Sequence, residues 1–460
     1  MFTATLSVRS LLFVLALVAL VLLAATTSRA AVYTVTQTTD SNFPNPDPNI
    51  LSLRLALSSA NQHPGLDLIV IPEGTYTLTI AGSGDNTNLT GDLDILDPVI
   101  IQGAGPDKTI IDGNTIDRVF DVVPVPGKDF SVLMVNLTIQ NGRVNNVEAP
   151  RGGGGINNWQ TLSLSNVVIK NNTVEGGVPG GGIENNHNLT LNKVVVRDNT
   201  VVATGELSYW IGGGIVNSGT GTLELTETTV SGNRADRGGG LFNGGLGTAT
   251  IERSLFTENR ARAGSGIVAY GILNLVNTTI HANTFDGIDG GQCALRVEGT
   301  TTVSFCTITD NASSREDIAG LCTGDSSILT LRSTILSGNK KPGTITSRNC
   351  TFSTPLTSAT YNLEDANTCG FLTTTNLINT DPKLGPLQDN GGPTQTRALA
   401  ADSPAIDYVR INTGVIVDQR GYKRPVGPWA DIGAYEYERD VSTFCFPIRS
   451  PDGKTAIICL

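Results

Sequence analysis

Three closely spaced aspartates near the N-terminus are the first residues that could do chemistry. Asp92 and Asp94 lie in the segment Gly91-Asp-Leu-Asp-Ile95, and Asp97 follows it. Alternate residues of a strand point to one face, so these carboxylates could bind Ca²⁺, which prefers oxygen ligands. The alternative is a solvated acidic edge that discourages strand pairing between molecules. No cofactor other than Ca²⁺ is expected.

Aromatic side chains in turns and loops are the second candidates. Trp159 lies in a turn, and Tyr209 and Trp210 lie in an insertion within the longest repeat of the chain. Loops commonly carry functional residues, and exposed rings can stack on the faces of sugars. The alternative is a tryptophan that folds over the edge of its own coil. The sequence therefore proposes Trp159, Tyr209 and Trp210 as ligand-binding residues for a glycan.

All seven cysteines follow residue 290. Cys445 and Cys459 flank the turn signal Ser450-Pro-Asp-Gly453 and could clip a hairpin, while Cys350 and Cys369 could close a loop. An odd number leaves at least one thiol unpaired in a monomer, and pairing cannot be deduced from sequence alone. Disulfides would require an oxidising compartment.

Two patterns of the polygalacturonase type are missing from the sequence. A lyase needs a base and a hydrolase needs two facing carboxylates, but neither a Gly-His-Gly nor an Arg-Ile-Lys motif occurs. The only histidines are His63, His187 and His281. We therefore expect no catalytic residues and a non-enzymatic structural, adhesion or glycan-binding role. A polysaccharide lyase or glycoside hydrolase on the same fold is the alternative.

Internal repeats dominate the middle of the chain. Glycine blocks lead into short apolar strands with spacings of 27, 32, 26 and 26 residues, and the first apolar residues are Ile156, Ile183, Ile215, Leu241 and Ile267. Each repeat ends in an apolar-x-x-Asn pattern, whose asparagines are Asn172, Asn199, Asn233, Asn259, Asn283, Asn311 and Asn339. A period near 27 holds two or three strands with their turns, and helical periodicity is absent from it.

These repeats predict an all-β, right-handed parallel β-helix of the pectate lyase type. One coil cannot bury its apolar face, whereas about ten coils stacked ~4.8 Å apart form a continuous core in a rod of roughly 50 Å. Glycine permits positive φ and close approach of neighbouring turns. The asparagines should form a ladder in which each tolerates the left-handed region and bonds to the coils on both sides.

The ends of the chain differ from the repeats. Residues 1–30 contain an apolar run and a small-residue cleavage pattern typical of a signal peptide. Residues 31–97 should form an N-terminal cap, with a helix over 51–61, and the first strands. The repeats occupy 98–345, terminal coils and a compact module occupy 346–438, and a cysteine-containing tail occupies 439–460.

Three C-terminal stretches resemble a known family. They are Asp381-Pro-Lys-Leu-Gly-Pro-Leu-Gln-Asp389 with its continuation to Asp407, Asp418-Gln-Arg-Gly421 with Arg424-Pro425, and Asp431-Ile-Gly-Ala-Tyr-Glu436. Together they resemble the choice-of-anchor Q domain of bacterial surface β-helix proteins, and the resemblance covers residues 376–438.

Two further patterns point to the same group. Leu51-Ser-Leu-Arg54 resembles the N-terminal CSLREXD motif, with Leu51 in place of its Cys and Leu55 in place of its Glu. The repeats are similar to those of polymorphic outer membrane proteins. The resemblance implies an exported, surface-associated bacterial β-helix and implies no particular reaction.

Charge and hydropathy limit the partners. The net charge is −11, and it becomes −13 when Arg9 and Arg29 leave with the signal peptide. A strongly acidic chain is a poor partner for nucleic acid or anionic membranes, and no segment after the signal is apolar enough to span a bilayer. We expect a secreted or cell-surface protein whose partners are glycans or other cell-envelope components. The sequence does not indicate an oligomeric state.

Overall fold

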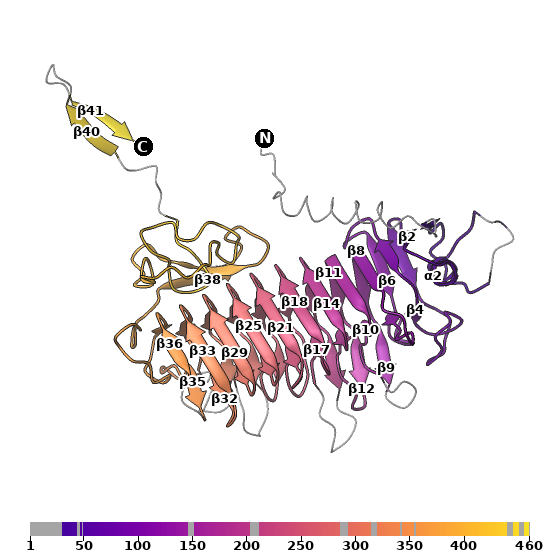
Figure 1. Cartoon of the computed structure of the whole chain (residues 1–460), viewed down its shortest axis with the longest axis horizontal. Helices are drawn as coiled ribbons and strands as arrows, with labels where there is room; N and C mark the ends of the chain where they lie inside the picture. The colour runs from indigo at the N-terminus through magenta and orange to yellow at the C-terminus, as the bar shows by residue number, and fades with distance from the viewer. Residues whose placement is uncertain are drawn as a thin grey trace.

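A computed structural model of the chain describes residues 30–43, 47, 49–145, 151–202, 211–285, 293–313, 320–340, 343–353, 356–438, 445–449 and 455–459. Within them the chain forms a parallel β-helix, which confirms the predicted fold (Figure 1). The rod has its N-terminal end at α2 and its C-terminal end at β35 and β36. Among these residues, none forms a helix that is both long and apolar enough to cross a bilayer.

One side of the rod is a sheet with one three-residue strand per coil. In the described part of the chain it has ten parallel strands: β4 (Leu93–Ile95), β7 (Phe120–Val122), β10 (Ile156–Asn158), β13 (Ile183–Asn185), β17 (Ile215–Asn217), β20 (Leu241–Asn243), β24 (Ile267–Ala269), β28 (Leu295–Val297), β32 (Leu321–Thr323) and β35 (Cys350–Phe352). This sheet is called the ten-stranded sheet below.

A larger parallel sheet wraps the rest of the rod in two lanes. The first lane contains β1 (Val32–Thr34), β2 (Asp67–Val70), β5 (Val99–Gln102), β8 (Ser131–Gln140), β11 (Thr161–Lys170), β14 (Asn188–Asn192), β18 (Thr222–Thr226), β21 (Thr248–Glu252), β25 (Ile272–Val276), β29 (Thr300–Ser304), β33 (Ile328–Arg332) and β36 (Ser358–Thr360). The second lane contains β3 (Gly74–Thr77), β6 (Thr109–Asp112), β15 (Val195–Arg197), β19 (Thr229–Ser231), β22 (Leu255–Thr257), β26 (Thr279–His281), β30 (Thr307–Thr309), β34 (Ile335–Ser337) and β37 (Leu363–Glu364). Strands β8 and β11 cross both lanes.

Shorter strands complete the coils. They are β9 (Arg143–Asn145), β12 (Thr173–Glu175), β16 (Thr200–Val202), β23 (Arg260–Ala261), β27 (Thr284–Phe285) and β31 (Ala312–Ser313). Two antiparallel pairs lie outside the coils, β38 (Leu384–Gln388) with β39 (Thr396–Leu399) and β40 (Cys445–Arg449) with β41 (Thr455–Cys459).

The predicted apolar column forms the interior wall of the ten-stranded sheet. Ile156, Ile183, Ile215, Leu241 and Ile267 are paired in register between successive strands, and all five are fully buried. They belong to one continuous core that runs the length of the rod. The prediction that these residues share an interior column is confirmed.

The glycine blocks meet both conformational demands expected of them. Gly180 opens its block with φ +76°, a left-handed conformation that side chains disfavour. A Cβ on Gly181 would lie 2.4 Å from the carbonyl oxygen of Gly213 in the next coil. The block therefore lets adjacent turns approach more closely than any larger residue allows.

The seven repeat asparagines form a buried ladder along the rod. The Nδ2 of Asn199 donates to Oδ1 of Asn233 at 3.0 Å, and Asn233 donates in turn to Asn259 at 3.0 Å. One expected detail is wrong, because the ladder asparagines do not take the left-handed conformation. The residue before them does so, as at Asn171 and Asp198, and this turn directs each ladder side chain inward.

A second asparagine ladder was not predicted. Asn158, Asn185, Asn217 and Asn243 end successive strands of the ten-stranded sheet, and each of the first three donates to the next at 2.7–2.8 Å. The two ladders occupy different corners of the coil, and both satisfy buried polar groups that the turns leave unpaired.

The N-terminal end is covered by a helix, as expected. Helix α2 (Leu53–Gln62) begins after Ser52, whose hydroxyl accepts a hydrogen bond from the backbone N–H of Leu55. It packs on β1, β2 and β4. Arg54, from the motif-like segment, is buried and pairs with Asp40 at 2.7 Å. It thereby fixes the helix to the first coils.

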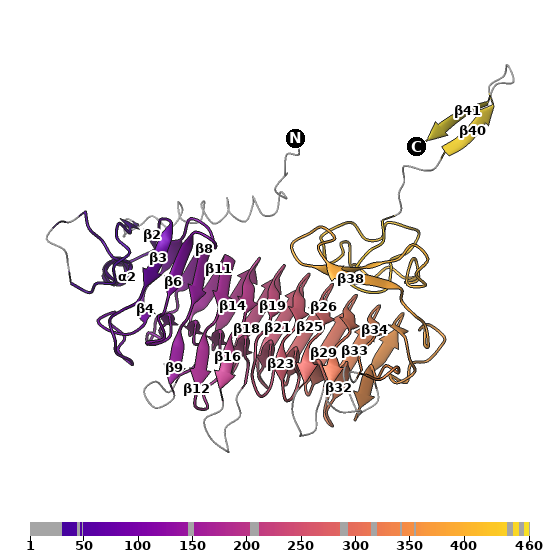
Figure 2. The same ribbon diagram turned by 180° about the vertical axis from the view of Figure 1, so that it is seen from behind.

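The C-terminal region folds back along the rod. The coils continue through β35, β36 and β37, and residues 380–438, called the docked segment below, then lie against the second lane (Figure 2). Arg424 is buried, pairs with Glu436 at 2.9 Å and donates to Oδ1 of Asn277 at 3.0 Å. The backbone N–H of Ala434 donates to the hydroxyl of Thr307. The residues that carry the family resemblance thus hold this segment on the larger sheet.

Two disulfides join described cysteines. Cys350 and Cys369 are paired, as the sequence suggested, and Cys293 and Cys322 form a second bridge that was not predicted. The backbones of Cys445 and Cys459 face each other across the β40–β41 hairpin. A disulfide between them stays a prediction, because their side chains lie outside the described residues.

Cys306 is the unpaired thiol among the described cysteines, and it is fully buried. Burial raises the pKa of this thiol to about 12, so it stays protonated at neutral pH, whereas alkylation requires the thiolate. We expect iodoacetamide at pH 8 to leave Cys306 unlabelled in the native protein and to label it in urea, as read by peptide mass. Rapid native labelling would contradict this placement.

Candidate functional site

The outer face of the ten-stranded sheet gathers the polar and aromatic residues most suited to function. In each strand the flanking residues point inward, as Ile156 and Asn158 do, and the middle residue points outward. The parallel register aligns these middle residues in a column: Asp94, Asp121, Asn157, Glu184, Val216, Phe242, Val268, Arg296, Cys322 and Thr351. The docked segment bonds to the other sheet. Within the column, Phe242, Arg296 and Thr351 are partly or fully exposed, and the other seven residues are buried.

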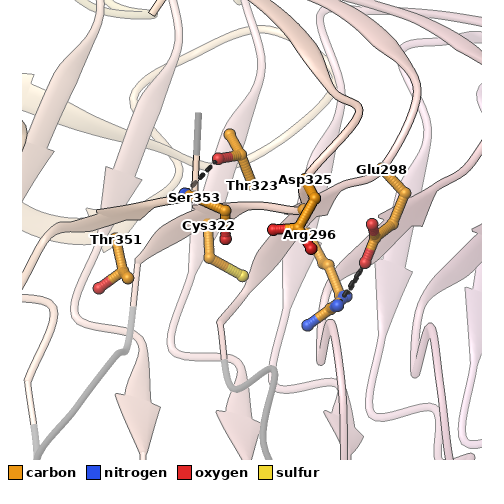
Figure 3. A pocket seen from close by; sticks show the side chains of 8 residues that line it. Arg296, Glu298, Cys322, Thr323, Asp325, Thr351 and Ser353 are labelled. Atoms are coloured by element: carbon orange, nitrogen blue, oxygen red, sulfur yellow. Dashed lines mark hydrogen bonds and ion pairs between the residues drawn. The ribbon is translucent and has the colours of Figure 1, made fainter. Parts of the chain in front are cut away.

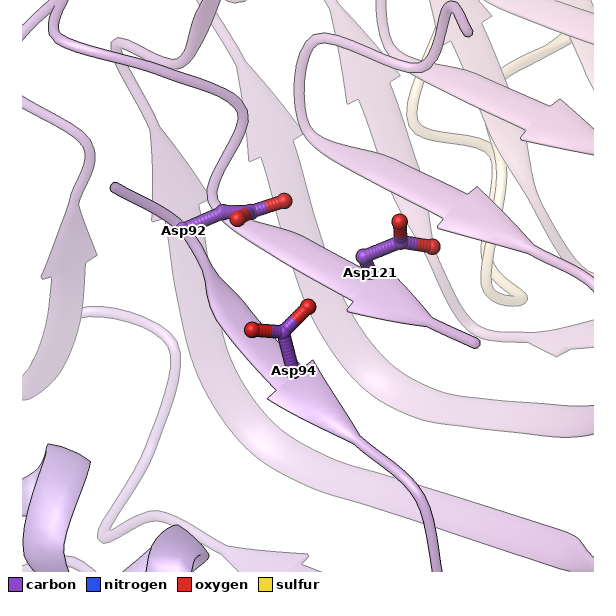
Figure 4. Close-up of side chains that lie close together, drawn as sticks. All are labelled: Asp92, Asp94 and Asp121. Atoms are coloured by element: carbon purple, nitrogen blue, oxygen red, sulfur yellow. The ribbon is translucent and has the colours of Figure 1, made fainter. Parts of the chain in front are cut away.

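An acidic cluster occupies the N-terminal end of the column. Carboxylate oxygens of Asp92, Asp94 and Asp121 lie within 4.8 Å of one another, and all three residues are buried. Figure 4 shows the carboxyl group of Asp94 directed toward the space between the other two. Asp94 and Asp121 are register partners on β4 and β7, so the backbone pairing itself sets their separation.

Two arginines approach this cluster. The buried Arg118 has its Nε 3.1 Å from Oδ2 of Asp92 and its Nη1 3.5 Å from Oδ2 of Asp121. Arg151 lies 3.8 Å from Asp121. The neighbouring Asn157 donates to Oδ1 of Asp121 at 2.9 Å.

Burial raises the pKa of the acids in this region. Burial places the pKa of Asp92 well above its ordinary value, although the positive charge of Arg118 lowers this pKa. Burial raises the pKa of Asp94 to about 8, against the lowering effect of the hydrogen bond from Asn88. The pKa of Asp121 and that of Glu184 are raised by the same cause. The cluster therefore holds more carboxylates than its arginines neutralise.

The expected trio of aspartates is corrected in two ways. Asp97 is not part of the cluster, since it forms an ion pair with Lys128 and accepts a hydrogen bond from the backbone of Gly65. Its place is taken by Asp121 from the next coil. The alternative of a solvated acidic edge is also wrong, because Asp92, Asp94 and Asp97 are all buried.

The aromatic candidates from the sequence fall in different environments. Trp159 follows β10 and is half-buried, with the guanidinium of Arg151 5.4 Å from its ring centre. A sugar stacking on that face would have to displace Arg151. Tyr209 and Trp210 lie outside the described residues.

A different aromatic pair lies in the middle of the outer face. Phe242 is the outward residue of β20, and Tyr270 follows β24 in the next coil, with ring centres 5.5 Å apart. Both residues are partly exposed. Arg237 donates to the Tyr270 hydroxyl at 3.2 Å and so fixes that ring. The pair offers a partly exposed apolar surface between the polar residues at the two ends of the column.

A polar pocket of about 250 Å³ follows the aromatic pair toward the C-terminal end (Figure 3). Its walls come from three successive coils, and the lining residues are Arg296, Glu298, Cys322, Thr323, Gly324, Asp325, Thr351 and Ser353. The Nε of Arg296 donates to Glu298 at 2.6 Å, and the backbone N–H of Ser353 donates to the hydroxyl of Thr323 at 3.1 Å. The floor is tied together by the Cys293–Cys322 disulfide.

The position after each strand explains how the pocket forms. By register, Tyr270, Glu298, Gly324 and Ser353 occupy equivalent places in four successive coils. A Cβ on Gly324 would lie 1.8 Å from the Glu298 carboxylate. The glycine therefore provides the space in which Glu298 lies beside Arg296.

Sequence reasoning missed Asp121, Arg118, Phe242, Tyr270 and Arg296. A signal for three of them was present, because Asp121, Phe242 and Arg296 follow the first apolar residue of their strands, as Asn157 and Glu184 do. An alignment of the repeats on the second residue of each of these strands would have identified the outward-pointing column. Arg118 and Tyr270 lie in turns, whose contacts the repeat pattern does not determine.

Comparisons with known proteins support the fold. A family model described as "Right handed beta helix region" matches residues 213–378. No curated protein matches the chain. Among solved structures, the A-module of a mannuronan C-5 epimerase from Azotobacter vinelandii is similar at 15% identity and a TM-score of 0.32, over 72% of this chain and 99% of that one. The matched family model and the parallel coils together show that the chain contains a right-handed β-helix.

Proposed function

We propose that this protein is a non-enzymatic, glycan-binding β-helix of the cell surface or the secreted fraction. The observation that carries the proposal is the continuous strip formed by Phe242, Tyr270 and the pocket around Arg296. An apolar ring surface beside convergent polar groups is the arrangement that small-molecule sites commonly use. The strip spans Phe242 to Thr351, four coil spacings or about 19 Å.

Each part of the strip has a role in this proposal. Tyr270 would stack on the apolar face of a sugar ring, with Phe242 behind it. The Arg296–Glu298 pair presents a donor and an acceptor that can both bond to neighbouring sugar hydroxyls. Thr323 and Thr351 add hydroxyl groups, each of which can donate or accept a hydrogen bond. These groups suit a neutral glycan, since the net charge of −11 opposes binding of a polyanion.

Surface location is part of the proposal. Disulfides such as Cys293–Cys322 persist in oxidising compartments, and residues 1–30 have the pattern of a signal peptide. Residues 376–438 resemble choice-of-anchor Q domains. In this proposal they attach the rod to the envelope and leave the ten-stranded sheet available to a ligand.

A glycan array followed by calorimetric titration tests the proposal. We expect the purified protein to bind a neutral glycan, and Tyr270→Ala and Arg296→Ala each to weaken binding by about tenfold or more, because each removes a stacking or charge-assisted contact. Phe43→Ala and Arg410→Ala are matched controls at exposed positions away from the strip. Equal affinity in all four variants would exclude the strip.

A polysaccharide lyase or hydrolase is the second candidate function. The acidic cluster favours it, because carboxylates beside Arg118 are the groups such enzymes use. Asp92, Asp94 and Asp121 are at most 5% exposed, however, so a polymer cannot reach them in this conformation. We expect neither unsaturated uronides nor new reducing ends from pectin or alginate above a heat-killed control. Either product would establish the enzyme.

A further inference from the structure

The acidic cluster at the N-terminal end of the outer face contains more buried carboxyl groups than nearby cations. Five carboxylates there are at most 8% exposed, and they belong to Asp92, Asp94, Asp117, Asp121 and Glu184. The guanidinium groups that approach them belong to Arg118 and Arg151. Arg54 also approaches, but its charge is matched by Asp40. Among the described residues, three carboxylates are left without a matching cation, which is costly in a buried site.

Among the three aspartates Asp92, Asp94 and Asp121, one carboxylate oxygen has no hydrogen-bond partner in the described part of the chain. Asp94 is fully buried, and its Oδ2 accepts a hydrogen bond from the backbone of Asn88 at 3.1 Å. Its Oδ1 has no hydrogen-bond partner within the described residues. Figure 4 shows the Asp94 carboxyl group directed toward Asp92 and Asp121. A buried acceptor without a donor needs an explanation, and a cation held between three carboxyl groups is one that this geometry favours.

The cluster is held by backbone that is already fixed. Asp94 and Asp121 are paired strand residues, and the carbonyl of Asp92 accepts a hydrogen bond from the buried Arg54 at 2.9 Å. Asn88 closes the preceding loop and bonds to both the backbone and the side chain of Asp94. The three carboxylates therefore cannot easily separate to relieve their repulsion.

We propose that Asp92, Asp94 and Asp121 bind one Ca²⁺ ion that stabilises the first coils. The three candidate ligands supply only oxygen atoms, which suits a hard cation and not zinc or copper. The ion would balance two of the three excess charges and occupy the unpartnered side of Asp94. This site differs from the trio suggested by sequence, because Asp121 replaces Asp97. It is independent of the glycan-binding strip.

Thermal unfolding of the purified protein in EDTA and in CaCl₂ tests the proposal. We expect Ca²⁺ to raise the Tm by about 2 to 4 °C at saturation. Asp94→Asn keeps the shape of the side chain and removes a carboxylate ligand, so it should abolish this shift. An aspartate with a purely structural role would leave the shift in place when it is replaced.

Two further variants and a binding measurement complete the test. Asp121→Asn should also abolish the shift, whereas Asp129→Asn, at an exposed position nearby, should retain it. Titration calorimetry with CaCl₂ should show about one more ion bound to the wild type than to Asp94→Asn. The proposal is overturned if Ca²⁺ leaves the wild-type Tm unchanged, if both cluster variants keep the shift, or if only Zn²⁺ produces it.

Discussion

Ile215→Asp is expected to prevent the chain from folding or to lower its stability by about 5 kcal/mol. Ile215 is fully buried in the interior column, between Ile183 and Leu241 of the neighbouring coils. A carboxylate at that position would face apolar side chains with no cation to pair with, one of the most costly changes in a core. Each coil depends on its neighbours for burial, so the damage should spread along the rod.

Urea denaturation followed by circular dichroism measures this effect. Ile272→Asp is the matched control, because Ile272 is 47% exposed on the outer side of β25. We expect the control to unfold near the wild-type urea concentration. Equal loss of stability in both variants would show that Ile215 is not buried in an apolar interior column.

Asn233→Ala is expected to lower stability by about 3 to 6 kcal/mol. The Asn233 side chain accepts hydrogen bonds from the backbone and side-chain amides of Asn199, and it donates to Asn259 and to the carbonyl of Val196. Alanine would leave these groups buried without partners, at about 1 to 3 kcal/mol for each unsatisfied group. The loss exceeds that of an ordinary hydrogen bond because the ladder is continuous on both sides.

Asn274→Ala serves as the control for the ladder variant. Asn274 is the middle residue of β25 and is partly exposed, so its loss should change stability by less than about 0.5 kcal/mol. Thermal unfolding of both variants gives the comparison. A ladder variant as stable as the control would mean that water replaces the lost amide.

The fold was predictable from the sequence because the repeats have the spacing and composition of stacked β-helix coils. Glycine blocks and asparagines at a period near 27 can satisfy their conformational and hydrogen-bonding needs only in stacked coils, and the structure stacks them in that way. The helix over 51–61 was also found close to its observed bounds of Leu53–Gln62, because its apolar spacing and the serine before it are local signals.

The candidate site was less predictable because it depends on contacts between coils. Asp94 and Asp121 are separated by a whole turn, and only the register of β4 with β7 brings them together. Asp97 is nearer to Asp94 in sequence, yet its side chain pairs with Lys128 on another loop. The pairing of Cys293 with Cys322 depends on the same coil-to-coil register.

We propose that the strip from Phe242 to Thr351 binds a glycan without transforming it. A crystal structure of the protein soaked with the best ligand from the glycan array would show whether it does so. We expect an intact sugar with one ring stacked on Tyr270 and hydroxyl groups bonded to Arg296 and Glu298. A cleaved or unsaturated sugar, or an intact sugar bound elsewhere on the rod with this strip empty, would contradict it.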